Sequence, residues 1–470
     1  MNDIFYLSAV DMAQAIRKRD ISVLELIRAH IDRAEDINPR INALVSERYE
    51  AALGEARAAD AALASGQATG PLFGLPVAHK DSYMVRGVRT TFGSRVFRDF
   101  VPTQDSAVVA RQRAAGAIIL GKTNMPEFGA GSHTFNEIFG VTRNPYRLDK
   151  SAGGSSGGAA AGLAAGLIAL ADGSDMGGSL RNPASFCNVV GLRPSIGRVP
   201  MSPTSYPFNT LTTGGPMGRG VADIALLLDV IAGADPQDPL SFDARPGAFF
   251  PLPDMDPKGV RIALSRDLGG LPFEPAVQAS LQEGISHLQN MGCIIEEDEP
   301  DFSDADHAFE VLRALAFATS YESLRSEQGD LLKDTVKWNI DLGLALKGSD
   351  ITAAERAHGR MFSRMADLLY RYDFLVAPVS QVAPFAADIE YPRQIAGVDM
   401  PHYIGWMRSC YRISVTGHPA ISVPCGFTAD GLPIGIQIVG RYRKERELLA
   451  FAQAFEKANP AGSVRPRFLP

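Results

Sequence analysis

Apolar residues recur at helical spacing through the first part of the chain. Leu24, Ile27 and Ile31 fall three to four positions apart, which places them on one face of an α-helix. The alanine-rich stretch 48–64 predicts a further helix, because a Ser-Gly pair follows it and would end it. We therefore predict a helical region over residues 1–66 that covers a sheet and carries no catalytic group.

From residue 70 onward, short apolar runs alternate with helical segments, and Gly and Pro separate them. Runs at 75–81 and 117–122 predict buried strands, with a helix over 108–115 between them. This alternation is typical of a largely parallel sheet with helices on both faces. The same pattern predicts further strands at 168–172, 260–265, 374–378, 420–424 and 434–439, and further helices at 157–167, 304–325 and 330–370.

The predicted fold class is α/β, with one large α/β/α domain whose central mixed, mostly parallel sheet is covered by helices. A chain of 470 residues could form two or three domains, but large α/β enzymes also fold as one. We expect a single domain over 1–470, in which the helices of 1–66 precede a core at 70–233. Residues 260–460 are expected to supply strands that rejoin the sheet. Within them, the helical region at about 304–370 is where we expect substrate selectivity.

Composition and charge exclude several classes of function. The chain is 46% hydrophobic and 21% charged, which suits a globular protein with a large core. Its net charge of −7 comes without any basic block, so nucleic acid is not expected as a partner. No apolar run approaches the roughly 18 residues of a membrane span, and the N-terminus lacks the pattern of a signal peptide. We therefore expect a cytoplasmic protein with no membrane partner.

The cysteines and histidines give no support to a metal site. The four cysteines lie far apart without a CxxC pair, and the eight histidines show no HExxH spacing. Cys187 lies near the candidate site in sequence, where a buried and inert thiol is the simpler interpretation. No metal and no cofactor are therefore expected.

Two glycine-rich clusters carry the candidate chemistry. The first, 153–158, sets two serines between glycine pairs, and the second, 175–181, places Ser179 directly after two glycines. Successive N–H groups of such a turn can converge on an oxyanion. A helix from residue 157 and a strand running back along it would make Ser155 a neighbour of Ser179. A flexible linker fits poorly because a dense apolar run follows, and a phosphate-binding loop would need Gly-Lys-Ser/Thr at the helix start.

Lys80 stands at the end of a predicted buried strand. The plain alternative is a surface ion pair with the adjacent Asp81. Burial would instead lower the pKa of the lysine by disfavouring its ammonium form. A free lysine, with a reference pKa of roughly 10.4, is only about one-thousandth neutral near pH 7. A buried Lys80 could therefore act as a general base, and Lys122 and Ser179 are expected at the same edge of the sheet.

Taken together, these stretches resemble the signature of the amidase signature family. The central run is Gly-Gly-Ser-Ser-Gly-Gly at 153–158 with Gly-Ser-Asp-Met-Gly-Gly-Ser-Leu-Arg-Asn-Pro-Ala at 173–184, and Pro-Val-Ala-His-Lys-Asp at 76–81 resembles the family's lysine motif. Further blocks that resemble the family lie at 121–128, 191–195, 215–219, 417–420 and 431–435. The resemblance covers roughly residues 70 to 440, and its central motif is highly specific.

The resemblance implies a Ser–cis-Ser–Lys triad. By position, Ser179 matches the nucleophile, Ser155 the bridging serine after a cis peptide bond, and Lys80 the base. Serine is a poor nucleophile until a base removes its proton, which a neutral lysine can do through the second hydroxyl. The oxyanion hole would be formed by the backbone N–H groups of Met176, Gly177, Gly178 and Ser179.

The remaining residues of the motif have supporting roles in this interpretation. Asp175 and Arg181 are expected to pair and brace the turn. Ser156 could join the proton relay or hydrogen-bond the loop, and the sequence leaves both open. His79 and Met176 depart from the commonest family pattern, which has a small or apolar residue before the lysine and often Thr at the second position. A cationic His79 would lower the pKa of the neighbouring lysine further.

The predicted function is hydrolysis of a carboxamide through a serine acyl-enzyme, with a small-molecule amide or related acyl compound as substrate. A hydrolase for carbamates, anilides or esters would use the same chemistry. The amidase component of a tRNA-dependent amidotransferase is a second alternative, although that component commonly carries Asp where this chain has Pro126. A non-catalytic binding protein is a third, against which the intact Lys80, Ser155 and Ser179 argue. The sequence leaves open whether the chain forms a homodimer.

Overall fold

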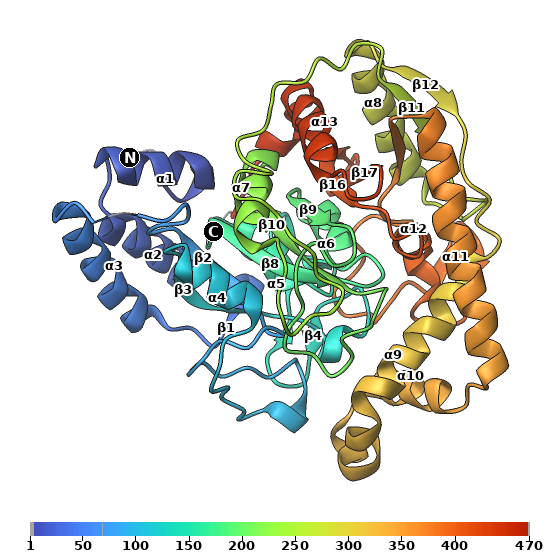
Figure 1. Cartoon of the computed structure of the whole chain (residues 1–470), viewed down its shortest axis with the longest axis horizontal. Coiled ribbons are helices and arrows are strands. Elements are labelled where there is room, and N and C mark those ends of the chain that lie inside the picture. The colour runs from blue at the N-terminus through green and yellow to red at the C-terminus, as the bar shows by residue number, and fades with distance from the viewer. Residues whose placement is uncertain (1–3, 68, 469–470) are drawn as a thin grey trace.

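An 11-stranded sheet forms the centre of the protein in a computed structural model that describes residues 4–67 and 69–468 (Figure 1). Residues 1–3 of the predicted helical region and the last two residues of the predicted domain lie outside the described residues. The strand order is β1-β3-β2-β8-β10-β9-β16-β17-β13-β11-β12. These strands are β1 (Leu44–Val45), β2 (Pro76–Lys80), β3 (Ile118–Thr123), β8 (Leu170–Asp175), β9 (Val190–Arg193), β10 (Thr213–Gly218), β11 (Arg261–Leu264), β12 (Ile294–Glu297), β13 (Phe374–Pro378), β16 (Ala420–Phe427) and β17 (Pro433–Val439). Three two-stranded sheets comprise β4 (Phe135–Asn136) with β5 (Gly140–Val141), β6 (Arg143–Asn144) with β7 (Arg147–Ser151), and β14 (Gln394–Ile395) with β15 (Val398–Asp399).

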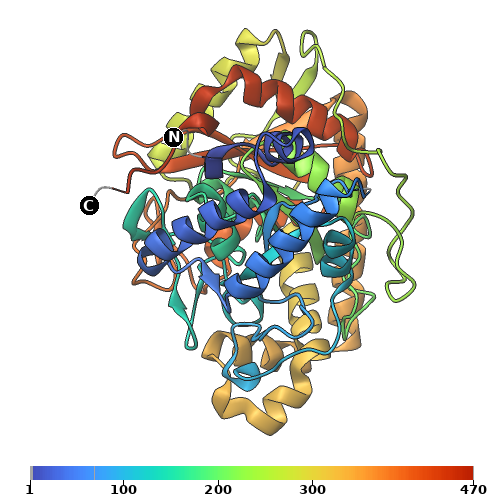
Figure 2. The ribbon, with the colours of Figure 1, turned by 90° about the vertical axis from the view of Figure 1, so that its left-hand side faces the viewer.

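Helices pack around this sheet. The α-helices are α1 (Ala9–Lys18), α2 (Val23–Ile41), α3 (Tyr49–Ala64), α4 (Ala107–Ala114), α5 (Gly157–Ala164), α6 (Arg181–Phe186), α7 (Val221–Ile231), α8 (Pro275–Asn290), α9 (Ala305–Gln328), α10 (Asp334–Leu344), α11 (Gly348–Arg371), α12 (Arg408–Ser414) and α13 (Glu445–Ala458). Short 3-10 helices lie at Ile4–Tyr6, Arg95–Phe97, Glu127–Gly129, Gly329–Leu331, Gly405–Met407 and Pro460–Ser463. Figure 1 shows α1–α3 and α9–α11 at opposite ends of the molecule, and Figure 2 shows α13 near the top of the view and α9 and α10 near the bottom. Among the helices of the described residues, none is both long and apolar enough to cross a membrane.

The predicted helices of the N-terminal region are confirmed, and local sequence signals explain their limits. At the start of α2, the Ser22 hydroxyl accepts the N–H of Glu25, and the Glu25 carboxylate accepts the N–H of Ser22. This capping box satisfies two backbone donors that the helix itself leaves free. The predicted apolar stripe is also present, since Ile27 and Ile31 are buried against the core.

The sheet is mixed, as predicted, but parallel pairing does not predominate. Six of its pairings are antiparallel and four are parallel. The parallel pairings join β3, β2 and β8 at one side, and β13, β11 and β12 at the other. The middle strands β10, β9, β16 and β17 pair antiparallel, since β16 and β17 form a hairpin and β10 returns beside β9 without the helical crossover that parallel strands need.

The parallel group β3-β2-β8 determines where the glycine-rich clusters lie. Its strands end at one edge of the sheet, with Lys80 as the last residue of β2 and Asp175 as the last residue of β8. Helix α5 begins within the first cluster, at Gly157, and all of its residues are buried. Its small residues allow the helix to approach the neighbouring backbone closely. A Cβ on Gly158, for example, would lie only 2.3 Å from the backbone nitrogen of Asn124. The helix therefore packs directly against the strand ends.

Candidate active site

Lys80 and Ser155 are in direct contact at this edge of the sheet. The Lys80 side chain is fully buried, and its Nζ lies 2.7 Å from Ser155 Oγ and 3.1 Å from Ser174 Oγ. The peptide bond between Gly154 and Ser155 is cis. The lysine thus faces two hydroxyl groups, one beside each glycine-rich cluster.

The two glycine-rich clusters meet as the sequence predicts. The N–H of Ser156, in the first cluster, donates to the carbonyl oxygen of Ser179, in the second, at 3.2 Å. Ser155, Ser174 and Ser179 all line the same cavity, whose volume is about 520 Å³. The turn from α5 into β8 therefore brings the two clusters, about 25 residues apart in the chain, to one surface.

The protein environment brings the pKa of Lys80 close to neutrality. Burial lowers the pKa of Lys80 from its usual 10.5 to about 7, even though Asp175 and Asp172 act in the opposite direction. A lysine with this pKa is about half neutral at pH 7, whereas a free lysine is almost entirely protonated. Lys80 can therefore accept a proton from a neighbouring hydroxyl.

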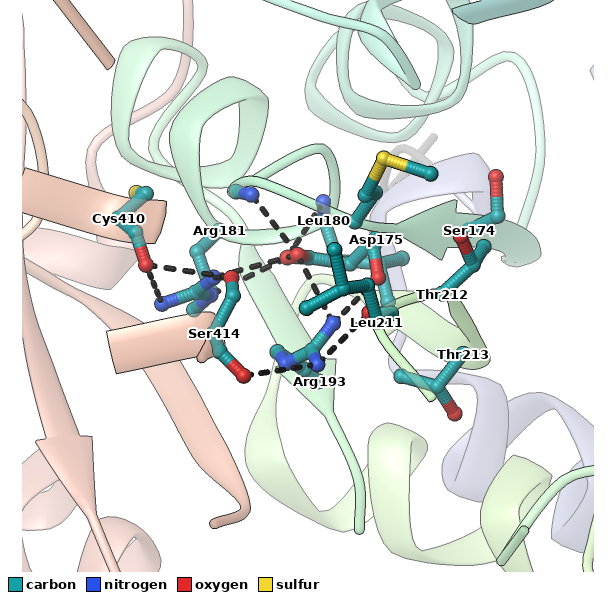
Figure 3. Close-up of polar contacts among 12 residues, drawn as sticks. Ser174, Asp175, Leu180, Arg181, Arg193, Leu211, Thr212, Thr213, Cys410 and Ser414 are labelled. Carbon is teal, nitrogen blue, oxygen red and sulfur yellow. Dashed lines mark hydrogen bonds and ion pairs between the residues drawn. The ribbon is translucent and has the colours of Figure 1, made fainter. Parts of the chain in front are cut away.

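Asp175 anchors the second cluster through two buried guanidinium groups (Figure 3). Its carboxylate accepts hydrogen bonds from Arg181 Nε at 3.1 Å and Arg181 Nη2 at 3.2 Å, and Arg193 Nη1 lies 3.4 Å away. Burial alone would raise the pKa of Asp175, but the two arginines outweigh it and hold that pKa well below its usual range. The predicted pair of Asp175 and Arg181 is present, and it fixes the turn that follows β8.

Arg193 was not singled out from the sequence, although it lies in one of the blocks that resemble the family. It donates to the backbone carbonyl of Asp175 and to that of Leu211 at 2.9 Å. A long-range contact of this kind has no periodic signal, so only the Gly-Leu-Arg-Pro-Ser block itself could have indicated it.

The turn after Asp175 contributes Met176, Gly177 and Ser179 to the lining of the cavity. The Gly178 N–H, which the sequence interpretation placed in the oxyanion hole, donates to the Asp175 carboxylate at 2.8 Å. Within the described residues, the N–H groups of Met176, Gly177 and Ser179 have no hydrogen-bond acceptor. Gly178 has a φ of +113°, and a Cβ there would lie 2.4 Å from Cys410 Cβ. This position therefore requires glycine.

The chain is similar to known proteins over nearly its whole length. The family model described as Amidase matches residues 25–449. The chain belongs to the amidase signature family. It is 36% identical to an acylamidase of Rhodococcus erythropolis, with 99% of this chain and 98% of that one aligned. It is also 36% identical to a glutamyl-tRNA(Gln) amidotransferase component of Moorella thermoacetica, over 99% of each chain. The crystal structure of a bacterial aryl acylamidase of the amidase signature family superposes with a TM-score of 0.89 at 30% identity, over 97% of each chain. The protein is therefore an amidase-family hydrolase.

His79, one of the two residues that depart from the family pattern, precedes Lys80 on β2. Its Nδ1 is 2.5 Å from Asp172 Oδ2, and the same oxygen accepts a hydrogen bond from Gln112 Nε2 at 2.8 Å. The other oxygen of Asp172 accepts the backbone N–H of Lys80 at 3.0 Å. His79 thus faces a carboxylate, which would offset any positive charge on its ring, and the group as a whole holds the end of β2 in place.

Asp81 does not pair with Lys80, so the surface ion pair that the sequence left open is absent from this site. Asp81 is buried and lies 3.3 Å from the Nζ of Lys122, which also donates to the carbonyl oxygen of Tyr83 at 2.6 Å. Lys122 therefore supports the neighbouring loop and takes no part in the contact between Lys80 and Ser155.

Two further residues that were considered from the sequence, Ser156 and Cys187, are buried. The hydroxyl of Ser156 is buried and has no hydrogen-bond partner among the described residues, so it makes neither of the contacts considered from the sequence. Cys187 is buried, and burial raises the pKa of its thiol, in agreement with an inert cysteine. Within the described residues, no group of three or more His, Cys, Asp or Glu side chains could hold a metal ion.

One part of the cavity wall is an aromatic cluster. Phe128 and Tyr321 stack with ring centroids 4.3 Å apart, and Phe317 meets Tyr321 edge-on at 5.7 Å. Of the helical region expected to contribute selectivity, α9 supplies Phe317 and Tyr321, whereas α10 and α11 do not line the cavity. Phe128, which ends one of the blocks that resemble the family, and the loop at 196–212 were not predicted to line a cavity, because irregular segments carry no hydrophobic periodicity.

Proposed function

We propose that this protein hydrolyses a carboxamide bond through an acyl-enzyme formed on Ser179. The observation that carries the proposal is the contact of 2.7 Å between Lys80 Nζ and Ser155 Oγ, in a cavity that Ser179 also lines. Neutral Lys80 takes the proton of Ser155, and Ser155 takes the proton of Ser179 as the Ser179 oxygen attacks the substrate carbonyl.

Collapse of the tetrahedral intermediate breaks the carbon–nitrogen bond. The proton held by Lys80 returns through Ser155 to the leaving nitrogen, which departs as a neutral amine or ammonia. A water molecule then attacks the acyl group on Ser179 by the same relay, and the acid product leaves. The enzyme returns to its starting protonation state, so the cycle requires no cofactor.

The backbone N–H groups of Met176, Gly177 and Ser179 are the donors we assign to the oxyanion. The three residues line the cavity, and their N–H groups have no acceptors among the described residues. Gly178 is left out of the oxyanion hole, because its N–H already donates to the Asp175 carboxylate and so holds the turn. Donors fixed in this way stabilise negative charge without reorganising during the reaction, and losing one typically reduces the rate about 10²–10³-fold.

The decisive experiment replaces Ser179 with Ala. S179A should lose both amide turnover and covalent labelling by a serine-directed fluorophosphonate, because the attacking oxygen is removed. The exposed Ser286, on α8, offers a matched control, and S286A should retain both activities. Labelling that persists in S179A would place the nucleophile on another residue.

The substrate is proposed to be an amide with an apolar acyl or amine group. The aromatic wall formed by Phe128, Phe317 and Tyr321 suits an aryl or alkyl group, and the relatives include an acylamidase and an aryl acylamidase. Aryl amides, short aliphatic amides, esters and carbamates assayed side by side would rank these classes. Faster cleavage of short aliphatic amides would contradict the assignment of an apolar group.

A second candidate is a glutaminase that works as one component of an amidotransferase. The relative from Moorella thermoacetica, 36% identical over 99% of each chain, favours it. Ammonia release from glutamine that depends on added partner proteins would establish this function. Hydrolysis of acylamides by the chain alone, with no release from glutamine, would exclude it.

A further inference from the structure

Arg313, on α9, is a buried cation in the wall of the cavity. Its residue is 3% exposed, and its side chain lines the cavity beside the turn that follows β8. Its Nη1 lies 3.3 Å from the sulfur of Met176, whose backbone N–H is one of the proposed oxyanion donors. The guanidinium therefore stands next to the reaction centre.

Neutral groups alone surround this guanidinium among the described residues. Arg313 Nε donates to Asn339 Oδ1 at 3.2 Å, and Nη2 donates to the Tyr403 hydroxyl at 2.8 Å. Its other contacts are the Met176 thioether and the rings of Phe317, Tyr403 and Phe309, whose centroids lie 4.6, 5.7 and 6.0 Å from the guanidinium carbon. Five N–H groups thus meet three acceptors, one of which is a weak sulfur acceptor.

Three of the other four buried arginines among the described residues pair with a carboxylate, and the fourth, Arg219, lies outside the cavity and donates to backbone carbonyl oxygens. Arg181 and Arg193 share the carboxylate of Asp175, and Arg198 pairs with Glu445 at 2.9 Å. Buried charges are normally paired, because removing an ion from water without a counter-charge is costly. In the described structure no carboxylate lies within 4.0 Å of Arg313, and Asp238, the other charged residue that lines the cavity, accepts the backbone N–H groups of Met201 and Leu240.

We propose that Arg313 is a binding site for a carboxylate of the substrate, so that the enzyme prefers amides that also carry an anionic group. A planar guanidinium with free N–H groups matches a carboxylate in shape as well as in charge. The aromatic side chains beside it would hold the apolar part of the same molecule. This inference rests on the proposed function, since it assumes that the cavity receives the amide.

Matched pairs of substrates test the proposal. Succinamate, glutaramate and adipamate would be compared with the neutral amides of the same length, and 4-acetamidobenzoate with acetanilide. The first series carries the carboxylate on the acyl side, and the second pair carries it on the leaving amine. We expect at least one anionic member to exceed its neutral partner by about 10- to 100-fold in kcat/KM, the range of a charge-assisted hydrogen bond.

Variants of Arg313 assign that preference to this residue. R313M should reduce the ratio of kcat/KM for the anionic substrate to kcat/KM for the neutral one to about one. R313K keeps the positive charge but not the planar pair of N–H donors, so it should retain part of the preference for the anionic substrate. Arg325 lies on the same helix, is exposed and pairs with Asp341, so R325M is the matched control and should leave the ratio unchanged. An equal loss of kcat/KM for anionic and neutral substrates in R313M would overturn the proposal. It would mean that Arg313 stabilises the oxyanion or the folded protein and does not bind a substrate carboxylate.

A binding measurement separates this inference from the proposed function. Calorimetry on S179A and S179A/R313M with glutaramate or 4-acetamidobenzoate needs no turnover. At least about tenfold weaker binding by the double variant supports the carboxylate site even if no amide is hydrolysed. Equal binding by the two proteins, or a wild-type enzyme that cleaves neutral amides without preferring any anionic partner, overturns the carboxylate site and leaves the serine mechanism standing.

Discussion

The floor and the wall of the cavity are built on different principles. The floor comprises Ser155 and Ser179, which line the cavity, together with Lys80 and Asp175, the last residues of β2 and β8, and hydrogen bonds and ion pairs hold these four residues. The wall includes a cluster of aromatic side chains from α9 and from loops, held by ring contacts. Directional polar contacts fix atoms closely and are costly to break, whereas apolar contacts are individually small and tolerate exchange. The chemistry is therefore expected to depend on the floor as a unit, and the choice of substrate on single residues of the wall.

The largest effect should come from removing the charge at the centre of the floor. D175N leaves Arg181 and Arg193 buried without their shared carboxylate. Breaking a buried ion pair in this way costs about 3–5 kcal/mol, so we expect the free energy of unfolding to fall by that amount. Denaturant unfolding measures the change.

The control for D175N is D254N. Asp254 pairs with Lys457 at 3.0 Å on the surface, where an ion pair contributes at most about 1 kcal/mol. If D175N and D254N destabilised the protein equally, the floor would not differ from an ordinary surface, and the contrast with the wall would fail.

The next effect is a pH dependence set by Lys80. Because burial lowers the pKa of Lys80 to about 7, the neutral form that accepts a proton is the major species only above that pH. Below it, the rate should fall about tenfold for each pH unit, since the neutral fraction falls by that factor. The rate of labelling of Ser179 by a fluorophosphonate, followed from pH 5 to 9, measures this fall in rate directly. A labelling rate that is flat down to pH 5 would show that another group acts as the base.

The floor could be predicted from the sequence because its residues lie in short, fixed spacings beside recognisable elements. A buried strand ending in Lys80, and glycines around Ser155 and Ser179, are local signals. The meeting of the two clusters followed from the lengths of one helix and one strand. Seven of the eleven strands of the central sheet were predicted for the same reason, since their apolar runs are continuous.

What could not be predicted depends on contacts between distant segments. Arg193 reaches Asp175 from another strand, and Arg313 reaches Met176 from a helix far along the chain. Neither position differs in its local pattern from an ordinary surface arginine. The antiparallel middle of the sheet was missed because pairing direction depends on the path of the connecting loops, which hydrophobic periodicity does not record.

The smallest effect should come from reshaping the wall. Phe317 is buried, meets Tyr321 edge-on and faces Arg313. F317L keeps an apolar side chain but removes the ring, so we expect KM for an aryl amide to rise about 3- to 10-fold, as for the loss of one aromatic contact. The kcat should stay within about twofold, because the floor is unchanged. Steady-state kinetics on an aryl and a short aliphatic amide separate the two parameters, and F362L, at a half-exposed position on α11 outside the cavity, is the control. A fall in kcat as large as the rise in KM would mean that the wall also positions the reacting groups, and the two regions would then act as one.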